Sequence, residues 1–240
     1  MSTALPALLG RTGDGNSKEG TAVIFDWDDT LMPTQYITGT VWASFARRGR
    51  VPQTSSCYKV LAAHAKAVEQ ILLAARSCGK VAILTLAKRP WVQQSANWYL
   101  TGLDFESLLQ RLEIPVYYAR EHVTARERAR ARSEPGVDIQ VVAKRNAMEK
   151  CLKQIMRRHC VKNVISIGDS LVEHEAVKDL MWAAPAQPLC KTVLLLEGPK
   201  VEELTDELHW LANSIDAMVA HPDDFDLSFE FNFEFEMRRL

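Results

Sequence analysis

Two aspartates lie two residues apart directly after the first short apolar run of the chain. Residues 22–25 form this run, and Asp26 begins the sequence DWDDTL that follows it. Side chains at positions i and i+2 of a strand point to the same side, so Asp26 and Asp28 are predicted to face one site. One of two such carboxyl groups can stay ionised as a nucleophile or metal ligand while the other donates a proton. An Asp-rich turn that closes a strand is the alternative interpretation.

Two later apolar runs also end in polar residues. Thr85 follows residues 81–84, and its hydroxyl could donate to a phosphate oxygen; a threonine that merely closes a strand is the alternative. Asp169 follows residues 164–167 and Gly168, where the glycine lets the backbone turn sharply. An aspartate at that position could bind a hard cation, which prefers oxygen ligands.

A lysine and a glutamate are further candidates, each with a competing explanation. Lys144 opens a predicted helix and could neutralise charge between a carboxylate and a bound phosphate, but it could also be a solvated side chain, and Lys150 is a rival. Glu173 stands four residues after Asp169. It could be an acidic group of the site, or it could form a capping box with Ser170, because Ser-x-x-Glu satisfies backbone N–H groups at a helix start.

Short apolar runs alternate along the chain with longer segments of helical period. The runs are β-branched or aliphatic on both faces, which is typical of strands covered by helices on both sides. The predicted strands are residues 22–25, 81–84, 114–118, 164–167 and 192–196, with a less regular one at 138–142. The predicted helices are residues 57–77, 144–159, 170–182 and 201–219.

This alternation predicts an α/β fold, a Rossmann-like doubly wound parallel sheet with helices on both faces. Residues 21–221 would form this domain, after a disordered leader at 1–20 and before a Phe-rich C-terminal strand or tail at 222–240. In such a fold, ligands bind at the carboxyl ends of the strands. The candidate residues lie at those ends.

The order of these motifs resembles the haloacid dehalogenase-like (HAD) phosphatase superfamily. The resemblance covers about residues 21–197 and is most specific in the segments DWDDTL and ISIGDS. It implies a Mg²⁺-dependent phosphoric monoester hydrolase with an aspartyl-phosphate intermediate. Asp26 would be the nucleophile, and Asp28 would be the general acid and then the base. Asp28 argues against a halide-removing enzyme and an ion-pumping ATPase.

The same resemblance implies roles for the other candidates. Thr85 and Lys144 would hold the phosphoryl oxygens. Asp26, Asp169 and the backbone carbonyl of Asp28 would bind Mg²⁺. Glu173 loosely matches a further acid of the fourth motif, and Ser170 beside it is a possible site residue.

The segments between the motifs leave room for a minimal cap only, so we expect an open site for a phosphorylated substrate of unknown type. Residues 119–135 contain five arginines, and clustered guanidinium groups recognise phosphate well. A solvated charged helix is the alternative, because glutamates are mixed in.

Residues 227–237 alternate strictly between apolar and polar side chains, which predicts an amphipathic strand. It could pack on the domain or contact a partner protein. The alternative function is therefore a catalytically silent HAD-fold binding or scaffold protein that uses this Phe-rich strand.

Composition excludes several partners. The formal net charge of −1 at pH 7 gives no global attraction to nucleic acid or an anionic membrane, so neither is expected. No stretch approaches the ~20 apolar residues of a membrane span. Five scattered cysteines without a CxxC pair argue against a disulfide framework and a zinc site. We therefore expect a cytoplasmic protein.

Overall fold

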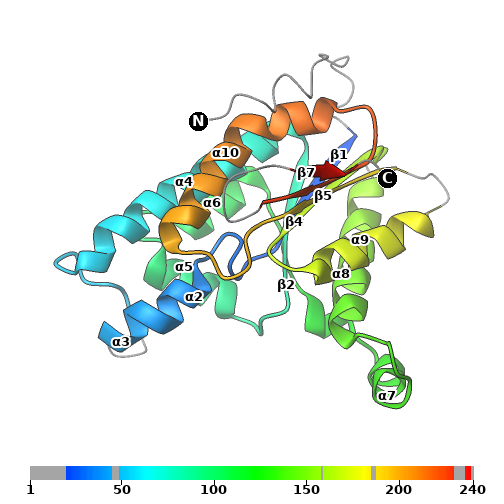
Figure 1. Ribbon diagram of the computed structural model, residues 1–240, viewed down its shortest axis with the longest axis horizontal. Helices are drawn as coiled ribbons and strands as arrows, with labels where there is room; N and C mark the ends of the chain where they lie inside the picture. Colours follow the sequence, from blue (N-terminus) through cyan, green and yellow to red (C-terminus); the bar gives the residue numbers. More distant parts are fainter. Residues whose placement is uncertain (1–19, 45–48, 158, 185–187, 230–235, 239–240) are drawn as a thin grey trace.

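The computed structural model describes residues 20–44, 49–157, 159–184, 188–229 and 236–238, and it has an α/β fold (Figure 1). Six parallel strands lie in the order β3-β2-β1-β4-β5-β6, and β7 pairs antiparallel with β6. The predicted Rossmann-like, doubly wound parallel sheet is confirmed. The strands are β1 (Thr21–Phe25), β2 (Lys80–Thr85), β3 (Val116–Tyr118), β4 (Asn163–Gly168), β5 (Leu189–Leu194), β6 (Phe225–Ser228) and β7 (Glu236–Arg238).

Helices cover both faces of the sheet (Figure 1). The longer helices are α4 (Ser56–Cys78), α5 (Trp91–Tyr99), α6 (Phe105–Leu112), α8 (Ile139–Met156), α9 (Leu171–Trp182) and α10 (Val201–Ala220). The shorter segments are α2 (Thr34–Tyr36), η1 (Ile37–Val41), α3 (Trp42–Ser44), η2 (Ala119–His122) and α7 (Ala125–Ser133). No helix in the described ranges is both long and apolar enough to cross a membrane.

Two apolar clusters, one on each face, hold the layers together. On one face α4 and α10 pack against β1, β2 and β4, through residues such as Val68, Leu211 and Ile165. On the other face α8 and α9 contribute side chains such as Met148 and Val177. All five residues of β1 are buried, as expected for a central strand with helices on both sides.

Gly79 permits a close contact between α4 and the beginning of β1. A Cβ atom at this position would lie only 2.3 Å from the carbonyl oxygen of Thr21, which is backbone and cannot move aside. The glycine therefore lets β2 start directly beside β1. This places the two strands in register, with Ala22 opposite Lys80.

The prediction of a strand at residues 138–142 is wrong, because Asp138 caps α8 and the residues after it form the first turn of that helix. The side chain of Asp138 accepts a hydrogen bond from the backbone N–H of Gln140 over 2.7 Å, which caps the helix start. The apolar residues that follow fit either a short strand or a helical turn, and the cap decides between them. The helix predicted at 144–159 therefore starts five residues earlier, at Ile139.

Two strand boundaries also differ from the prediction. The strand expected at 114–118 pairs with β2 only from Val116 onward, and the strand expected at 192–196 ends at Leu194. Past that point the backbone N–H of Leu196 donates to a side chain, Glu207 Oε1, over 3.0 Å instead of joining the sheet.

The amphipathic strand predicted at 227–237 is not one continuous strand. The chain forms β6, which pairs with β5, and later β7, which returns antiparallel; residues 230–235 lie outside the described part of the chain. The predicted alternation holds where it can be followed. Phe225, Leu227 and Phe229 are buried in the cluster with α4 and α10, and Phe229 contacts the edge of Trp210 at a ring distance of 5.0 Å.

We expect Phe229→Ala to lower the free energy of unfolding by about 3–5 kcal/mol, because it empties a packed site in the core. Ser228→Ala, at the neighbouring half-buried position, should change it far less. Urea denaturation of both variants measures the difference. Equal stability of the two variants would show that the C-terminal segment contributes little to the fold.

Candidate active site

Polar residues from three adjacent strands meet at the carboxyl edge of the sheet. Asp26 follows β1, Thr85 ends β2 and Asp169 follows β4, and β1 lies between the other two strands. The backbone N–H of Asp26 donates to the carbonyl of Ile167 over 2.9 Å, which extends the ladder past the end of β1. The strand order thus places residues that are far apart in sequence at one site.

Lys144 lies at the centre of this site with its side chain completely buried. Its ammonium group donates to Asp26 Oδ1, lies 2.6 Å from Glu173 Oε1, and donates to the carbonyl of Leu84 over 2.9 Å. Burial works against the charged form, but Asp26 and Glu173 raise the pKa of Lys144 above its usual value. The lysine therefore stays charged and joins α8 to β1, β2 and α9.

The capping interpretation of Glu173 is wrong. Ser170 accepts no hydrogen bond from the start of α9, and its hydroxyl donates to Glu173 Oε2. Burial alone would raise the pKa of Glu173, but the charge of Lys144 and the hydrogen bonds from Lys144 and Ser170 hold it below the usual value. Glu173 is thus a buried, ionised partner of Lys144.

Gly168 makes room for this inward-facing carboxyl group. A Cβ atom there would lie 2.8 Å from Glu173 Cγ and 3.0 Å from Glu173 Oε2. The glycine of the sequence ISIGDS therefore has a packing role in addition to the turn that the sequence suggested.

The carboxyl group of Asp28 is held by three donors. Thr34 Oγ1 and Trp91 Nε1 each donate to Oδ1 over 2.7 Å. Thr85 Oγ1 donates more weakly to Oδ2, over 3.4 Å, and also accepts from the backbone N–H of Ala87 over 2.9 Å. The orientation of Asp28 is fixed mainly through Oδ1, so Oδ2 is the oxygen with room for a further interaction.

Negative charge accumulates at this edge beyond what Lys144 balances. Burial raises the pKa of Asp26 to about 8, against the pull of Lys144, and the charges of Glu173 and Asp169 add to the rise. Burial also raises the pKa of Asp169 to about 7, with Glu173 and Asp29 adding to it. A cation bound here would relieve this repulsion.

The carboxyl pair Asp26 and Asp169 suits Mg²⁺ rather than a metal that needs a closed site. Within the described ranges, no three His, Cys, Asp or Glu side chains converge as a metal cluster. Mg²⁺ is usually held by one or two carboxylates, with waters and substrate phosphates completing its shell. Asp169 Oδ1 is positioned by the hydroxyl of Thr30 over 3.4 Å. The residues present therefore fit this ion.

Two residues of the site were not found from the sequence. Trp91 and Thr34 contact Asp28, although neither ends a strand. Thr34 lies only six residues after Asp28, at the start of α2, which the motif does not cover; Trp91 is brought in by the start of α5. Lys150, the sequence rival of Lys144, is exposed and makes no contact with the carboxyl groups.

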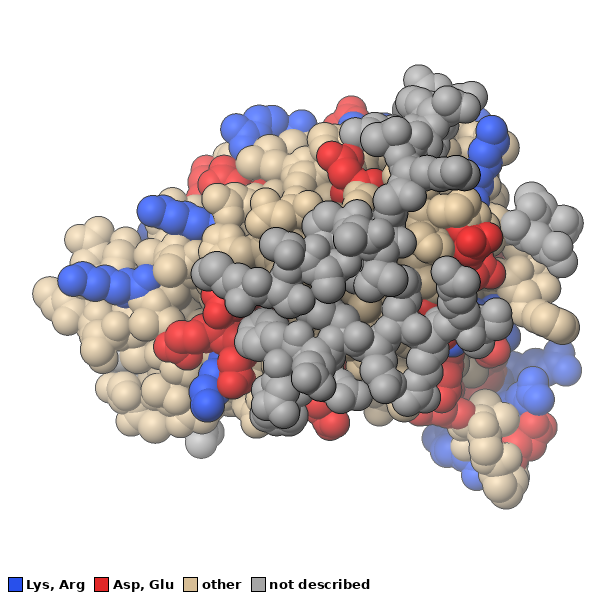
Figure 2. Space-filling view, turned by 45° about the horizontal axis from the view of Figure 1, so that its top comes forward, with Lys and Arg blue, Asp and Glu red and all other residues tan. Residues whose placement is uncertain are grey.

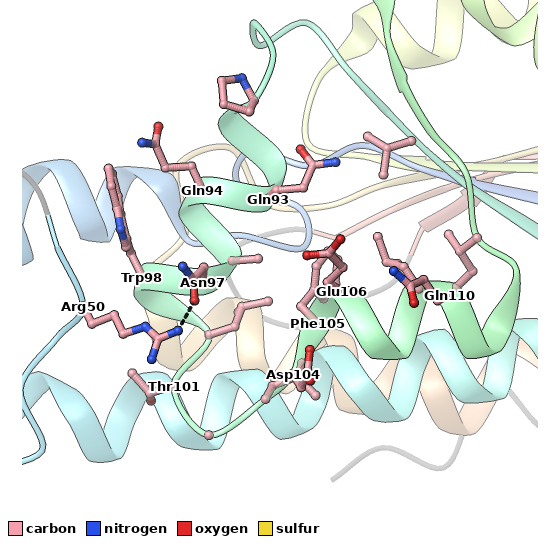
Figure 3. Close-up of a pocket in the computed structure, with 18 of the residues that line it drawn as sticks. Arg50, Gln93, Gln94, Asn97, Trp98, Thr101, Asp104, Phe105, Glu106 and Gln110 are labelled. Atoms are coloured by element: carbon pink, nitrogen blue, oxygen red, sulfur yellow. Dashed lines mark hydrogen bonds between the residues drawn. The ribbon is translucent and has the colours of Figure 1, made fainter.

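A groove that could hold a ligand lies elsewhere. It has a volume of about 1310 Å³ and lies between α5, α6 and the start of β3, where Arg50 donates to Asn97 (Figure 3). Gln94, Trp98, Asp104 and Gln110 also line it. None of the candidate catalytic residues lines this groove; they lie at the carboxyl edge of the sheet.

The candidate site is defined by the sheet order and these side-chain contacts alone. No protein-family model matches this chain, and neither does any curated protein or solved structure.

Proposed function

We propose that this protein is a Mg²⁺-dependent phosphoric monoester hydrolase of the HAD-like type, with Asp26 as nucleophile. The observation that carries the proposal is the buried ammonium group of Lys144 between Asp26 and Glu173. These three residues come from α8, the end of β1 and α9, and the resemblance in the sequence pointed to Lys144 and Asp26 and, more loosely, to Glu173. Burying an ammonium group with two carboxyl groups is costly and has no obvious value for packing alone.

Asp26 is suited to attack phosphorus. Its Oδ1 is held by Lys144, while Oδ2 accepts no hydrogen bond from any described residue. In the proposed reaction, Asp26 Oδ2 forms a bond to phosphorus and the bond from phosphorus to the ester oxygen breaks. Thr85 supplies a hydroxyl close to Asp28 that can turn to a phosphoryl oxygen.

Asp28 moves the protons in both halves of the reaction. It gives a proton to the departing ester oxygen, so that an alcohol leaves. It then accepts a proton from the water that attacks phosphorus, which releases inorganic phosphate and restores Asp26. Such general acid–base assistance typically contributes ~10²–10⁴-fold to the rate. Asp28 Oδ2 is the oxygen that would carry the proton, because two donors already occupy Oδ1.

Asp26 and Asp169 would hold Mg²⁺, with the backbone carbonyl of Asp28. The bound ion would supply positive charge that lets an anionic carboxylate approach an anionic phosphate. The raised pKa values of both carboxyl groups support this assignment, because burial chiefly, with the nearby charge of Glu173 in addition, disfavours their ionised forms, and a bound cation would favour them.

The scaffold alternative has less support. It depends on the Phe-rich C-terminal segment as a contact surface, but Phe225, Leu227 and Phe229 are buried inside the domain.

We expect Asp26→Asn to abolish Mg²⁺-dependent hydrolysis of 4-nitrophenyl phosphate, because an amide oxygen is a poor nucleophile. Asp206→Asn makes the same chemical change at an exposed position of α10 and should retain wild-type turnover. Steady-state phosphate release measures both variants. Near-normal release by folded, metal-loaded Asp26→Asn would refute the nucleophile assignment.

We expect Asp169→Asn to raise the Mg²⁺ concentration for half-maximal activity by about tenfold or more, because it removes a charged ligand. Glu173→Gln should leave that concentration nearly unchanged while lowering kcat, because Glu173 acts through Lys144. Titrating Mg²⁺ against activity in both variants shows which substitution raises the metal requirement. If only Glu173→Gln needs more metal, the two roles are reversed.

The same Asp169→Asn variant has a second readout in stability. The raised pKa of Asp169 means that the metal-free fold loses stability as pH rises from about 4, where the unfolded carboxyl group ionises, to about 7. Above that range, metal-free Asp169→Asn should therefore melt at a higher temperature than the wild type. A lower melting temperature in the presence of a chelator would contradict the proposed charge excess.

A further inference from the structure

Helix α7 (Ala125–Ser133) is not explained by the hydrophobic core. It lies beyond the start of α8 at one end of the molecule (Figure 1), and none of its residues is buried. Most short helices depend on packing an apolar face for their stability. Here four of the nine residues are arginine instead.

Polar contacts nevertheless fix this helix in place. Thr124 and Glu127 form a capping box, with Thr124 Oγ1 accepting from the N–H of Glu127 over 3.2 Å and Glu127 Oε2 accepting from the N–H of Thr124 over 2.7 Å. Glu127 Oε1 also accepts from Asn146 Nδ2 over 2.9 Å. Asn146 lies two residues after Lys144, so α7 is tied to the helix that carries the central lysine.

The glutamates of this region are already engaged. Glu121 pairs with Arg89 at 3.0 Å, and Arg130 pairs with Glu134 at 2.6 Å. Glu127 is used by the capping box and Asn146. The acidic residues therefore leave most of the arginines unbalanced.

The remaining arginines have no acidic partner in the described part of the chain. Arg128 donates only to the backbone carbonyls of Arg120 and Val123, over 3.2 and 3.3 Å. The guanidinium groups of Arg120, Arg126 and Arg132 are exposed and make neither an ion pair nor a hydrogen bond with described residues. Three guanidinium groups are thus free to meet an anionic ligand, and that of Arg128 has no acidic partner.

Helix α7 lies toward the same edge of the sheet as the candidate active site. Helix α7 follows η2, which leaves the carboxyl end of β3, and parallel strands have their carboxyl ends at one edge of the sheet. Figure 2 shows basic and acidic side chains gathered at the end of the molecule where α7 lies. Since Glu121, Glu127 and Glu134 already have partners, the available charge near α7 is positive.

We infer that α7 and Arg120 form a docking arm for an acidic stretch of a phosphorylated protein substrate, an inference that rests on the proposed function. Clustered arginines recognise acidic and phosphorylated peptide segments through paired N–H donors. Nucleic acid is a poorer fit, because single-strand binding normally combines a basic groove with aromatic side chains for stacking. Helix α7 has no aromatic residue that could stack on a base.

Direct binding tests this inference without any turnover. The probe is a fluorescein-labelled oligoglutamate peptide, followed by fluorescence anisotropy at low salt. The double variant Arg126→Gln with Arg132→Gln should weaken binding about three- to tenfold, since exposed ion pairs each contribute modestly. Glutamine preserves helix propensity. The double variant Lys59→Gln with Lys66→Gln removes the same charge from exposed positions of α4 and should bind like the wild type.

Three results would overturn the docking arm. The wild type could fail to bind the peptide, the lysine variant could lose as much affinity as the arginine variant, or labelled oligothymidylate could bind more tightly than oligoglutamate through the same arginines.

Turnover then separates docking from catalysis. For the arginine variant, the ratio of kcat/KM for a phosphoserine peptide with a Glu-rich flank to that for 4-nitrophenyl phosphate should fall about three- to tenfold. An unchanged ratio contradicts the inference. If the wild type hydrolyses neither substrate, the proposed function fails, and the binding comparison alone decides whether α7 docks acidic peptides.

Discussion

The ion pairs of one buried lysine organise the functional edge of this protein. Lys144 has no exposed surface, and moving an ammonium group out of water costs several kcal/mol unless partners compensate. Asp26, Glu173 and the carbonyl of Leu84 provide that compensation, and they come from different elements of the fold. The contact requires the strand order that brings β1 beside β2 and β4, and it requires Gly168, whose missing Cβ admits the Glu173 side chain.

This arrangement is poor for stability and useful for chemistry. One lysine faces several carboxyl groups, and burial, with the nearby negative charges in addition, raises the pKa values of Asp26 and Asp169. A fold selected only for stability would replace such a cluster with apolar side chains of similar size. Strongly shifted pKa values in carboxyl groups at the ligand-binding edge of a parallel sheet are typical of functional sites. Under the proposed function, a cation and a phosphate would bind at this site and balance each other's charge.

The sequence predicted the sheet and which side chains gather at its carboxyl edge, because both depend on local pattern. Asp26 and Asp169 were found since they directly follow buried runs, and parallel strands bring such ends together. The sequence left Lys150 as a rival of Lys144, because the choice depends on which face of the helix meets the sheet. That face could not be assigned while the start of α8 at Ile139 was missed. The Ser-x-x-Glu spacing fits both a helix cap and an inward-facing acid. The contact with the buried Lys144 shows that Glu173 faces inward. The contact of Trp91 with Asp28 depends on how α5 sits beside β1, which no local pattern encodes.

The most direct test of the central claim is to locate the covalent intermediate. Wild-type protein is incubated with 4-nitrophenyl phosphate and Mg²⁺, quenched and reduced with borohydride, which converts an aspartyl-phosphate to homoserine. Peptide mass spectrometry then identifies the modified position. Our account predicts homoserine at position 26, formed only with substrate and metal present. Modification at another aspartate, or steady turnover with no modified residue at all, would contradict it.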